Sequence, residues 1–226
     1  MKKQNILVVA AHPDDELLGV AGTLALHVER GDDVKVLIIG QGALSRDEAD
    51  AAEVELLRSQ AQAAAHIIGI HGIRFDSLPD NEFDTVGVLS ITKIVERVIA
   101  EVCPDVLYTH NAHDLNVDHR LTFQAVTTAC RPCAQNAPSE IYTFETLSST
   151  EWQSKSEEPF RPNVYVDISS TIEKKIAALN EYKSEMRLHP HSRSLEGVRI
   201  LAQYRGLEAG VRFAEAFHLE RRIGMS

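Results

Sequence analysis

The chain has 226 residues, of which 44% are hydrophobic, and a formal net charge of -10 at pH 7. This composition is typical of a globular protein, and the negative charge argues against a nucleic-acid-binding surface, which needs a basic patch. No apolar run approaches the roughly 18 residues that span a bilayer, and three sparse cysteines are typical of a reducing compartment, so we expect a cytoplasmic protein without a membrane span.

Short apolar runs alternate with helical patterns along the chain. The predicted strands are Ile6–Ala10, Val34–Ile39, Gly72–Phe75, Val106–Thr109, Ile141–Thr146 and Val164–Asp167. Helical patterns lie between them near residues 16–29, 47–69, 85–102 and 119–130. The strands are mostly apolar on both faces, as parallel strands covered by helices are. The alternation therefore predicts an α/β fold with a Rossmann-like, doubly wound, mostly parallel sheet flanked by helices.

The last third of the chain has a different pattern. Residues 169–186 and 194–206 are expected to be helical, with a polar run at 187–193 between them and a final strand at 211–219. No linker, repeat or low-complexity segment interrupts the sequence. We therefore expect one domain over residues 1–226, with a C-terminal helical and strand extension that covers the site.

Four polar residues follow the first predicted strand directly. They are His12, Asp14, Asp15 and Glu16, in the sequence Ala11-His-Pro-Asp-Asp-Glu. They lie where a strand ends and a helix begins, which is where open α/β sheets bind ligands. A metal ion would give the imidazole and the carboxylates a common partner.

A second polar cluster, residues 110–119, follows the strand Val106–Thr109. The carboxyl ends of parallel strands share one edge of a sheet, so this loop is expected to meet the first cluster. His12, Asp15 and His119 would then offer two nitrogens and one oxygen, which is the pattern of a catalytic zinc site with a fourth position for water. The alternative is that the histidines only form hydrogen bonds within a loop.

This donor set suits the hydrolysis of an amide. A metal ion polarises the carbonyl and acidifies a bound water, and a neighbouring carboxylate can take the proton and return it to the leaving amine. Asp14 and Asp15 are adjacent and do not both face one metal easily, so one is expected to be a ligand and the other a base. Glu16 is expected to support the ligands or to cap the helix.

The two motifs together resemble the PIG-L/LmbE-like zinc-dependent de-N-acetylases. The resemblance rests on Ala11–Glu16, on Asp118-His119 and on the C-terminal segment Tyr182-Lys183-Ser184-Glu185. It implies that His12, Asp15 and His119 bind the metal and that Asp14 is the general base. It also implies a substrate that carries an N-acetylglucosamine group, as in a phosphatidylinositol conjugate or a thiol precursor, and it is compatible with a homo-oligomer. Zn²⁺ is the expected cofactor, although the same donors accept Fe²⁺.

The second cluster departs from the pattern of this family. Asn116 stands where many relatives have a histidine that stabilises the developing oxyanion. An amide can donate a hydrogen bond to an oxyanion but cannot carry a proton. We therefore expect His113, in preference to His110, to act as electrophile or acid with the help of Asn116. Asp118 is expected to hold the tautomer of a histidine.

Three further residues are candidates for binding the substrate. Relatives often have an arginine early in the second helix, where this chain has Leu57. Arg46, in the loop after the second strand, is the candidate that binds a sugar hydroxyl or a phosphate in its place. Asp80 follows the third strand and is expected either to bind sugar hydroxyls or to form a turn. His191, in the polar run 187–193, is expected either to contact substrate or to lie in a surface loop.

The sequence thus favours a metal-dependent N-deacetylase that acts on a small N-acetylated sugar or glycoconjugate. One alternative is an amidase that removes a larger acyl group from a sugar-thiol conjugate. The other is a non-catalytic metal-binding module with a Rossmann-like fold. A dinucleotide-dependent dehydrogenase is the least favoured interpretation, because the first strand is not followed by the glycine-rich G-x-G-x-x-G turn.

Overall fold

A computed structural model describes residues 3–42 and 51–224 of the chain. One sheet contains seven strands in the order β3-β2-β1-β4-β5-β7-β6. The strands are β1 (Asn5–Ala10), β2 (Asp33–Gly40), β3 (Gly72–Leu78), β4 (Val106–His110), β5 (Glu140–Phe144), β6 (Val164–Asp167) and β7 (Ala214–Arg222). The first five are parallel to one another, whereas β7 runs antiparallel to both β5 and β6. The predicted α/β fold with a mostly parallel sheet is confirmed.

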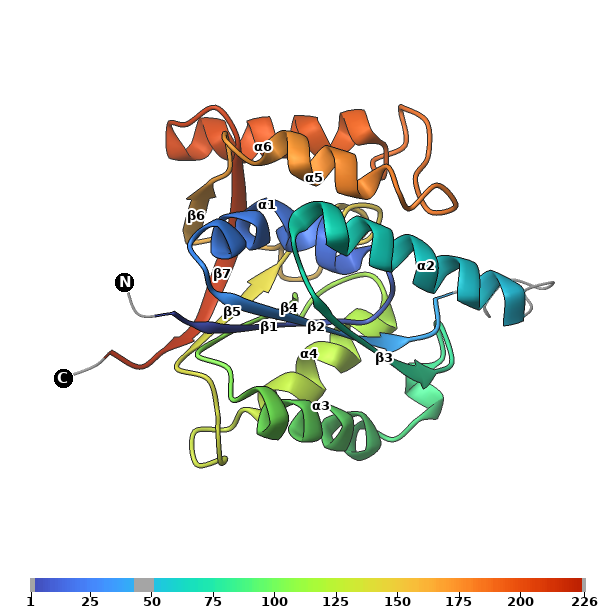
Figure 1. Ribbon diagram of the computed structural model, residues 1–226, viewed down its shortest axis with the longest axis vertical. Helices are drawn as coiled ribbons and strands as arrows, with labels where there is room; N and C mark the ends of the chain where they lie inside the picture. Colours follow the sequence, from blue (N-terminus) through green and yellow to red (C-terminus); the bar gives the residue numbers. More distant parts are fainter. Residues whose placement is uncertain (1–2, 43–50, 225–226) are drawn as a thin grey trace.

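Helices cover both faces of this sheet (Figure 1). The helices are α1 (Asp15–Glu29), α2 (Ala51–Ile68), α3 (Val88–Val102), α4 (Val117–Ala129), α5 (Ile172–Leu179) and α6 (Leu195–Ala209). In β1, Ile6 and Val8 pack into the cluster that contains α1 and α2, whereas Leu7 and Val9 pack into the cluster with α3 and α4. Alternate side chains of one strand are therefore buried on opposite faces, which explains its continuous apolar sequence.

The C-terminal helices α5 and α6 lie over the helical layer on the α1 side of the sheet, with α5 packed against α1 and α2 (Figure 1). Glu215 of β7 fixes this arrangement from inside the protein. Its carboxylate accepts hydrogen bonds from the backbone nitrogens of Gly22 and Thr23 in α1, at 2.8 and 2.7 Å, and from Nζ of Lys175 in α5, at 2.6 Å. Three elements distant in sequence thus share one buried carboxylate.

The helix boundaries differ from the prediction in two places. The predicted helix 85–102 begins at Val88, because Phe83–Thr85 form a separate 3₁₀ turn in which Phe83 is buried and its amide donates to Oδ1 of Asp118. The predicted helix 169–186 is confined to Ile172–Leu179. Beyond it, tighter turns replace the helix and bury Tyr182 completely. In both places a long-range contact of one aromatic residue overrides the local helical pattern.

The other predicted elements agree with the structure to within a few residues. The final strand is shifted from 211–219 to Ala214–Arg222, because α6 ends at Gly210 in a left-handed conformation with φ of 73°. Gly210 and the residues after it return the chain to the sheet before β7 begins. No helix in the described part of the chain has the length and apolar character that a membrane crossing needs.

Candidate metal centre and active site

The first site residues lie in the turn that joins β1 to α1. Asp14 caps α1 in a left-handed conformation, with φ of 99°, which is uncommon for a residue with a side chain. Oε2 of Glu16 accepts a hydrogen bond from the Asp14 nitrogen at 3.0 Å, and the Tyr182 hydroxyl donates to Oε1 of Glu16 at 2.6 Å. Burial raises the pKa of Glu16 to about 7, against the opposing effect of the Tyr182 bond. Glu16 thus holds the turn that presents Asp14 and Asp15.

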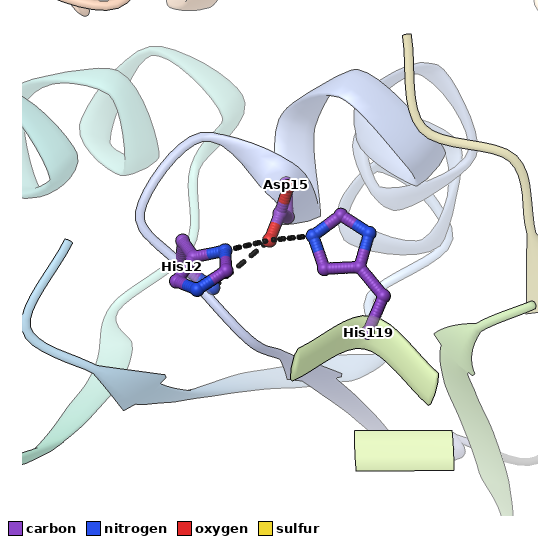
Figure 2. A group of neighbouring side chains, drawn as sticks. All are labelled: His12, Asp15 and His119. Atoms are coloured by element: carbon purple, nitrogen blue, oxygen red, sulfur yellow. Dashed lines mark hydrogen bonds and ion pairs between the residues drawn. The ribbon is translucent and has the colours of Figure 1, made fainter. Parts of the chain in front are cut away.

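Three candidate ligands converge on one point at the carboxyl edge of the sheet (Figure 2). Oδ2 of Asp15 lies 3.4 Å from Nδ1 of His12 and 3.2 Å from Nε2 of His119. His12 follows β1, Asp15 begins α1, and His119 lies in the first turn of α4. One donor atom of each residue lies within 4.8 Å of the others, so the three atoms can contact a single ion.

A buried carboxylate orients the imidazole of His119. Oδ1 of Asp114 lies 3.2 Å from Nδ1 of His119, on the side of the ring opposite Asp15. Asp114 is itself held by the hydroxyls of Ser149 and Thr150. A proton on Nδ1, the ring nitrogen on the Asp114 side, leaves the lone pair of Nε2 pointing at the centre of the three ligands, which is the tautomer that a metal requires.

Two further carboxylates orient His12 in the same manner. Oδ2 of Asp118 and Oδ1 of Asp80 each lie 2.9 Å from Nε2 of His12. Protonation of Nε2 leaves Nδ1 free to bind an ion beside Asp15. A second group of possible metal donors also includes His12, together with Asp80 and Asp118, and its donor atoms lie within 4.8 Å of one another. That group would use Nε2 of His12, the ring nitrogen on the side opposite Asp15.

The electrostatics of the three ligands favour a cation. Burial alone would raise the pKa of Asp15, but His119, His110 and His12 hold it well below its ordinary value. Burial would lower the pKa of His119, but Asp15 and Asp114 raise it to about 9. The carboxylates that attract a proton to His119 attract a metal ion to the same place, so the donor set fits a divalent metal.

His110 lies next to the three ligands but has a different environment. It is completely buried and stacks on His119 with 3.9 Å between the ring centroids. Its Nε2 accepts a hydrogen bond from the Ala11 nitrogen at 2.9 Å. Burial and the neighbouring His119 lower the pKa of His110 to about 3. A neutral ring whose Nε2 is occupied by the backbone supports the β1–α1 turn and is poorly placed to donate a proton.

Asp14 faces an arginine from the C-terminal part of the chain. Its Oδ2 lies 3.1 Å from Nη1 of Arg193, which also lies 3.6 Å from Oε2 of Glu185. Nε of Arg193 donates to Oγ of Ser148 at 2.8 Å. Burial raises the pKa of Asp14 well above its ordinary value, the Arg193 charge opposes this shift, and the charges of Asp15 and Glu185 add to it. Arg193 therefore stabilises the ionised form of Asp14.

These residues line a polar cavity of about 270 Å³, which we call the catalytic pocket. Its walls include His12, Asp14, Asp15, Asp80, Asn81, Leu115, Asn116, His119, Ser148, Ser149, Glu185 and Arg193. Arg193 is the one arginine or lysine among the described lining residues, and two carboxylates already neutralise it. The described part of the lining therefore suits a polar ligand rich in hydroxyl and amide groups.

Asn116 lines the catalytic pocket, but both ends of its amide are already engaged. Oδ1 accepts the Asp118 nitrogen at 2.8 Å as the N-cap of α4, and Nδ2 donates to Oδ1 of Asn81 at 3.0 Å. A hydrogen bond from Nδ2 to a substrate would require it to leave Asn81. Asp80 is buried in this pocket, beside the Nε2 atom of His12.

The structure does not bring His113 or His191 to the lining of the catalytic pocket. His113 is exposed and lines a different cavity. The chain turns between Asp114 and Asn116, so that Asn116 lines the catalytic pocket and His113 does not. This position gives no support to the expected role of His113 as electrophile or acid. His191 packs edge-on against Trp152 and accepts a hydrogen bond from the Arg193 nitrogen, so it supports the loop of Arg193. Arg46 lies outside the described residues.

Sequence reasoning did not assign a role to Asp114, Glu185 or Arg193 individually. Asp114 was visible as an acid five residues before His119, but only the turn between them brings it to Nδ1. Arg193 and Glu185 lie more than 170 residues from Asp14, and the segment Tyr182–Glu185 does not by itself indicate which residue Glu185 contacts. Only the packing of the C-terminal segment over the β1–α1 turn places them in the pocket.

Comparison with known proteins gives matches along most of the chain. Residues 7–130 match the family described as PIG-L, GlcNAc-PI de-N-acetylase. A probable N-acetyl-alpha-D-glucosaminyl L-malate deacetylase 2 of Bacillus anthracis is 24% identical over 192 residues, which cover 81% of this chain and 82% of that protein.

Two solved structures share the fold. The N,N'-diacetylchitobiose deacetylase of Pyrococcus horikoshii has a TM-score of 0.75 at 20% identity, and the match covers 95% of this chain and 82% of that one. A 4-carboxy-2-hydroxymuconate hydratase of Pseudomonas putida has a TM-score of 0.78 at 23% identity, and the match covers 100% of this chain and 99% of that one. The same fold thus occurs in proteins with two different activities, so the chemistry has to be argued from the site.

Proposed function

The chain belongs to the GlcNAc-PI de-N-acetylase (PIG-L) family, and on that premise we propose that it hydrolyses the acetamide of an N-acetylglucosamine-type sugar or glycoconjugate, releasing acetate and a free amine. The observation that carries this proposal is the position of Asp14. It lies beside three converging metal donors, and the charge of Arg193 opposes the rise in its pKa that burial causes.

His12, Asp15 and His119 would hold the metal, and we favour Zn²⁺, with Fe²⁺ as the alternative that the same donors accept. A bound ion would supply a Lewis acid for the amide carbonyl and would acidify a coordinated water. Asp114 and Asp118 fix the two imidazoles in the tautomers that this binding needs. The remaining steps fall to residues of the chain itself.

Asp14 acts as the general base and then as the general acid. Its carboxylate accepts a proton from the attacking water and returns it to the nitrogen of the leaving amine. Because His110 is neutral and bonded to the backbone, and His113 lies in another cavity, no described histidine besides the two proposed ligands lines the pocket to take over this proton. Arg193 supports the step in which Asp14 accepts a proton, since the charge of Arg193 favours the ionised carboxylate of Asp14.

Asn116 and Asp80 are the proposed contacts with the substrate. The Nδ2 group of Asn116 can donate to the carbonyl oxygen of the acetamide as negative charge develops there, after exchanging its bond to Asn81. Asp80 and Asn81 offer acceptors and donors to sugar hydroxyls at the same wall. Their arrangement supports a sugar, because each hydroxyl can both donate and accept a hydrogen bond.

Acetate release by purified protein tests this proposal. The protein is stripped with a chelator, reloaded with Zn²⁺ or anaerobically with Fe²⁺, and assayed on a panel of N-acetylhexosamine glycosides. We expect activity with at least one metal, none in the stripped protein, and at least a hundred-fold loss in Asp14→Asn with metal still bound. A metal-loaded protein that releases acetate from none of the panel contradicts the proposed substrate class. Release of a longer acyl group, detected by mass spectrometry, favours the amidase.

A further inference from the structure

Helix α6 carries an apolar stripe on its outer face, and we propose that this stripe is the contact between two copies of the chain, which pack antiparallel across a two-fold axis. The α6 stripe, as we call it, consists of Ile200, Tyr204 and Leu207 in the helix and Val211 just beyond its end. None of these four residues lines the catalytic pocket. The inference therefore stands apart from the proposed function and adds a second copy as a partner of this chain.

The α6 stripe occupies the face where a surface helix normally carries polar residues. The face of α6 that is buried in the protein consists of Val198, Ala202 and Gly206. By helical periodicity Ile200, Tyr204 and Leu207 lie on the opposite face, and they are 49%, 53% and 81% exposed. Charged side chains are expected there, because the core face of the helix is already covered. Three large apolar side chains in their place indicate an interaction surface, and α6 lies at the margin of the molecule (Figure 1).

The spacing of the α6 stripe suits contact with a second helix. Its successive members are four, three and four residues apart, which is the spacing of the apolar seam in a two-helix coiled coil. Helix α6 has 15 residues and is therefore about 22 Å long. Two helices of this length form an interface at the small end of specific contacts. We therefore expect a dimer that forms and dissociates at micromolar concentrations.

The charges at the two ends of the α6 stripe identify the partner as a second copy. Glu196 lies in the first turn of α6, Arg212 follows the end of the helix, and both are exposed. Tyr204 is eight residues from each of them. An antiparallel pair of helices centred on Tyr204 therefore places Glu196 beside Arg212 of the partner subunit, and the two-fold axis repeats this contact at the other end. A parallel pair would bring like charges together.

The charged residues beside the α6 stripe already have partners within the chain. The Nη1 and Nη2 atoms of Arg199 donate to the two carboxylate oxygens of Glu173, at 2.7 and 2.9 Å. Arg205 donates to Glu145 through Nε and Nη2 and to Glu208 through Nη1, each at 2.7 Å. A second helix that covers the stripe would leave these counter-ions in place. It would thus avoid the large cost of burying a charge without its partner.

Sedimentation velocity of the metal-loaded protein tests this contact. We expect the average molar mass to rise towards twice its low-concentration value between about 1 µM and about 200 µM protein. Leu207→Glu places a carboxylate in the apolar contact and should weaken the association at least ten-fold. Leu89→Glu makes the same change at a 63% exposed position of α3 and should leave the association unchanged. Because both leucines are exposed, circular dichroism should show both variants folded.

Charge reversal tests the antiparallel arrangement. Glu196→Arg and Arg212→Glu each bring like charges together at both ends of the contact, and each should weaken the association at least five-fold. An equimolar mixture of these two variants allows a heterodimer in which opposite charges meet at both ends. The mixture should therefore associate nearly as tightly as the unmodified protein, and so should the chain that carries both substitutions.

These outcomes do not depend on any enzymatic assay. A constant mass over the concentration range, or equal effects of Leu207→Glu and Leu89→Glu, overturns the contact even if the protein releases acetate. A mixture of Glu196→Arg and Arg212→Glu that associates no better than either variant alone overturns the antiparallel arrangement. Recovery in the mixture, together with normal association of Leu89→Glu, supports the contact even if no acetamide is hydrolysed.

Discussion

Nη1 of Arg193 lies 3.1 Å from Oδ2 of Asp14, although 179 residues separate them in the chain. The contact joins the loop before α6 to the turn after β1, and so links the C-terminal part of the protein to the proposed general base. Because Glu185 contacts the same guanidinium, one positive charge is shared by two buried carboxylates. The proposed base therefore depends on a residue outside its own motif.

Removal of Arg193 should shift the pH dependence of activity. Without its charge, burial and the neighbouring carboxylates raise the pKa of Asp14 further, so the base becomes protonated at a higher pH. We expect Arg193→Ala to lower kcat/KM at neutral pH by about 10–100-fold and to move the acid limb of the profile to higher pH. Arg193→Lys keeps the charge and should show a smaller shift, and the exposed Arg187→Ala in the same loop is the control. An unshifted acid limb in Arg193→Ala would contradict the role of this pair.

Asp114 should control the affinity for metal. In Asp114→Asn, the negative charge 3.2 Å from Nδ1 of His119 is lost, and with it the electrostatic preference for a proton on Nδ1. We expect the metal to bind about 10–100-fold more weakly in competition with a chromophoric chelator. The exposed Asp84→Asn removes the same charge outside the pocket and should bind normally. Equal affinity of the two variants would exclude Asp114 as the partner that orients His119.

The two functions of Asn116 can be separated by a pair of variants. Asn116→Ala removes both the N-cap of α4 and the amide donor, and should lower the free energy of unfolding by about 1 kcal/mol. Asn116→Ser keeps a capping oxygen, so its stability should change by only a few tenths of a kcal/mol. Both variants lack Nδ2 and should lose at least ten-fold in kcat. Full kcat in a folded Asn116→Ser protein would remove Asn116 from the proposed chemistry.

Lys175 and Lys174 should differ sharply in their importance for stability. Lys175→Met leaves the carboxylate of Glu215 buried without its cation and should cost about 3–5 kcal/mol in urea unfolding. Lys174 forms an exposed ion pair with Glu29, and Lys174→Met should cost less than about 1 kcal/mol. Similar losses in the two variants would show that the buried network does not hold α1, α5 and β7 together.

Much of the fold follows from local pattern. Strands β1, β2 and β4 contain apolar runs separated by helical patterns, and most of their residues are buried because helices cover both faces of the sheet. The boundaries that differ from the prediction are those set by distant partners. Helix α5 ends at Leu179 because the turns beyond it bury Tyr182 against Glu16, a contact across 166 residues that no local window contains.

The sequence by itself determined the class of the site. The polar residues after β1 and β4 identify His12, Asp15 and His119 as neighbours, because the carboxyl ends of parallel strands meet at one edge of the sheet. The tertiary structure decided which residues surround them. It placed Asp114 beside Nδ1 of His119, Arg193 beside Asp14 and His113 in a separate cavity, since the direction of a loop side chain depends on long-range packing and not on its distance along the chain.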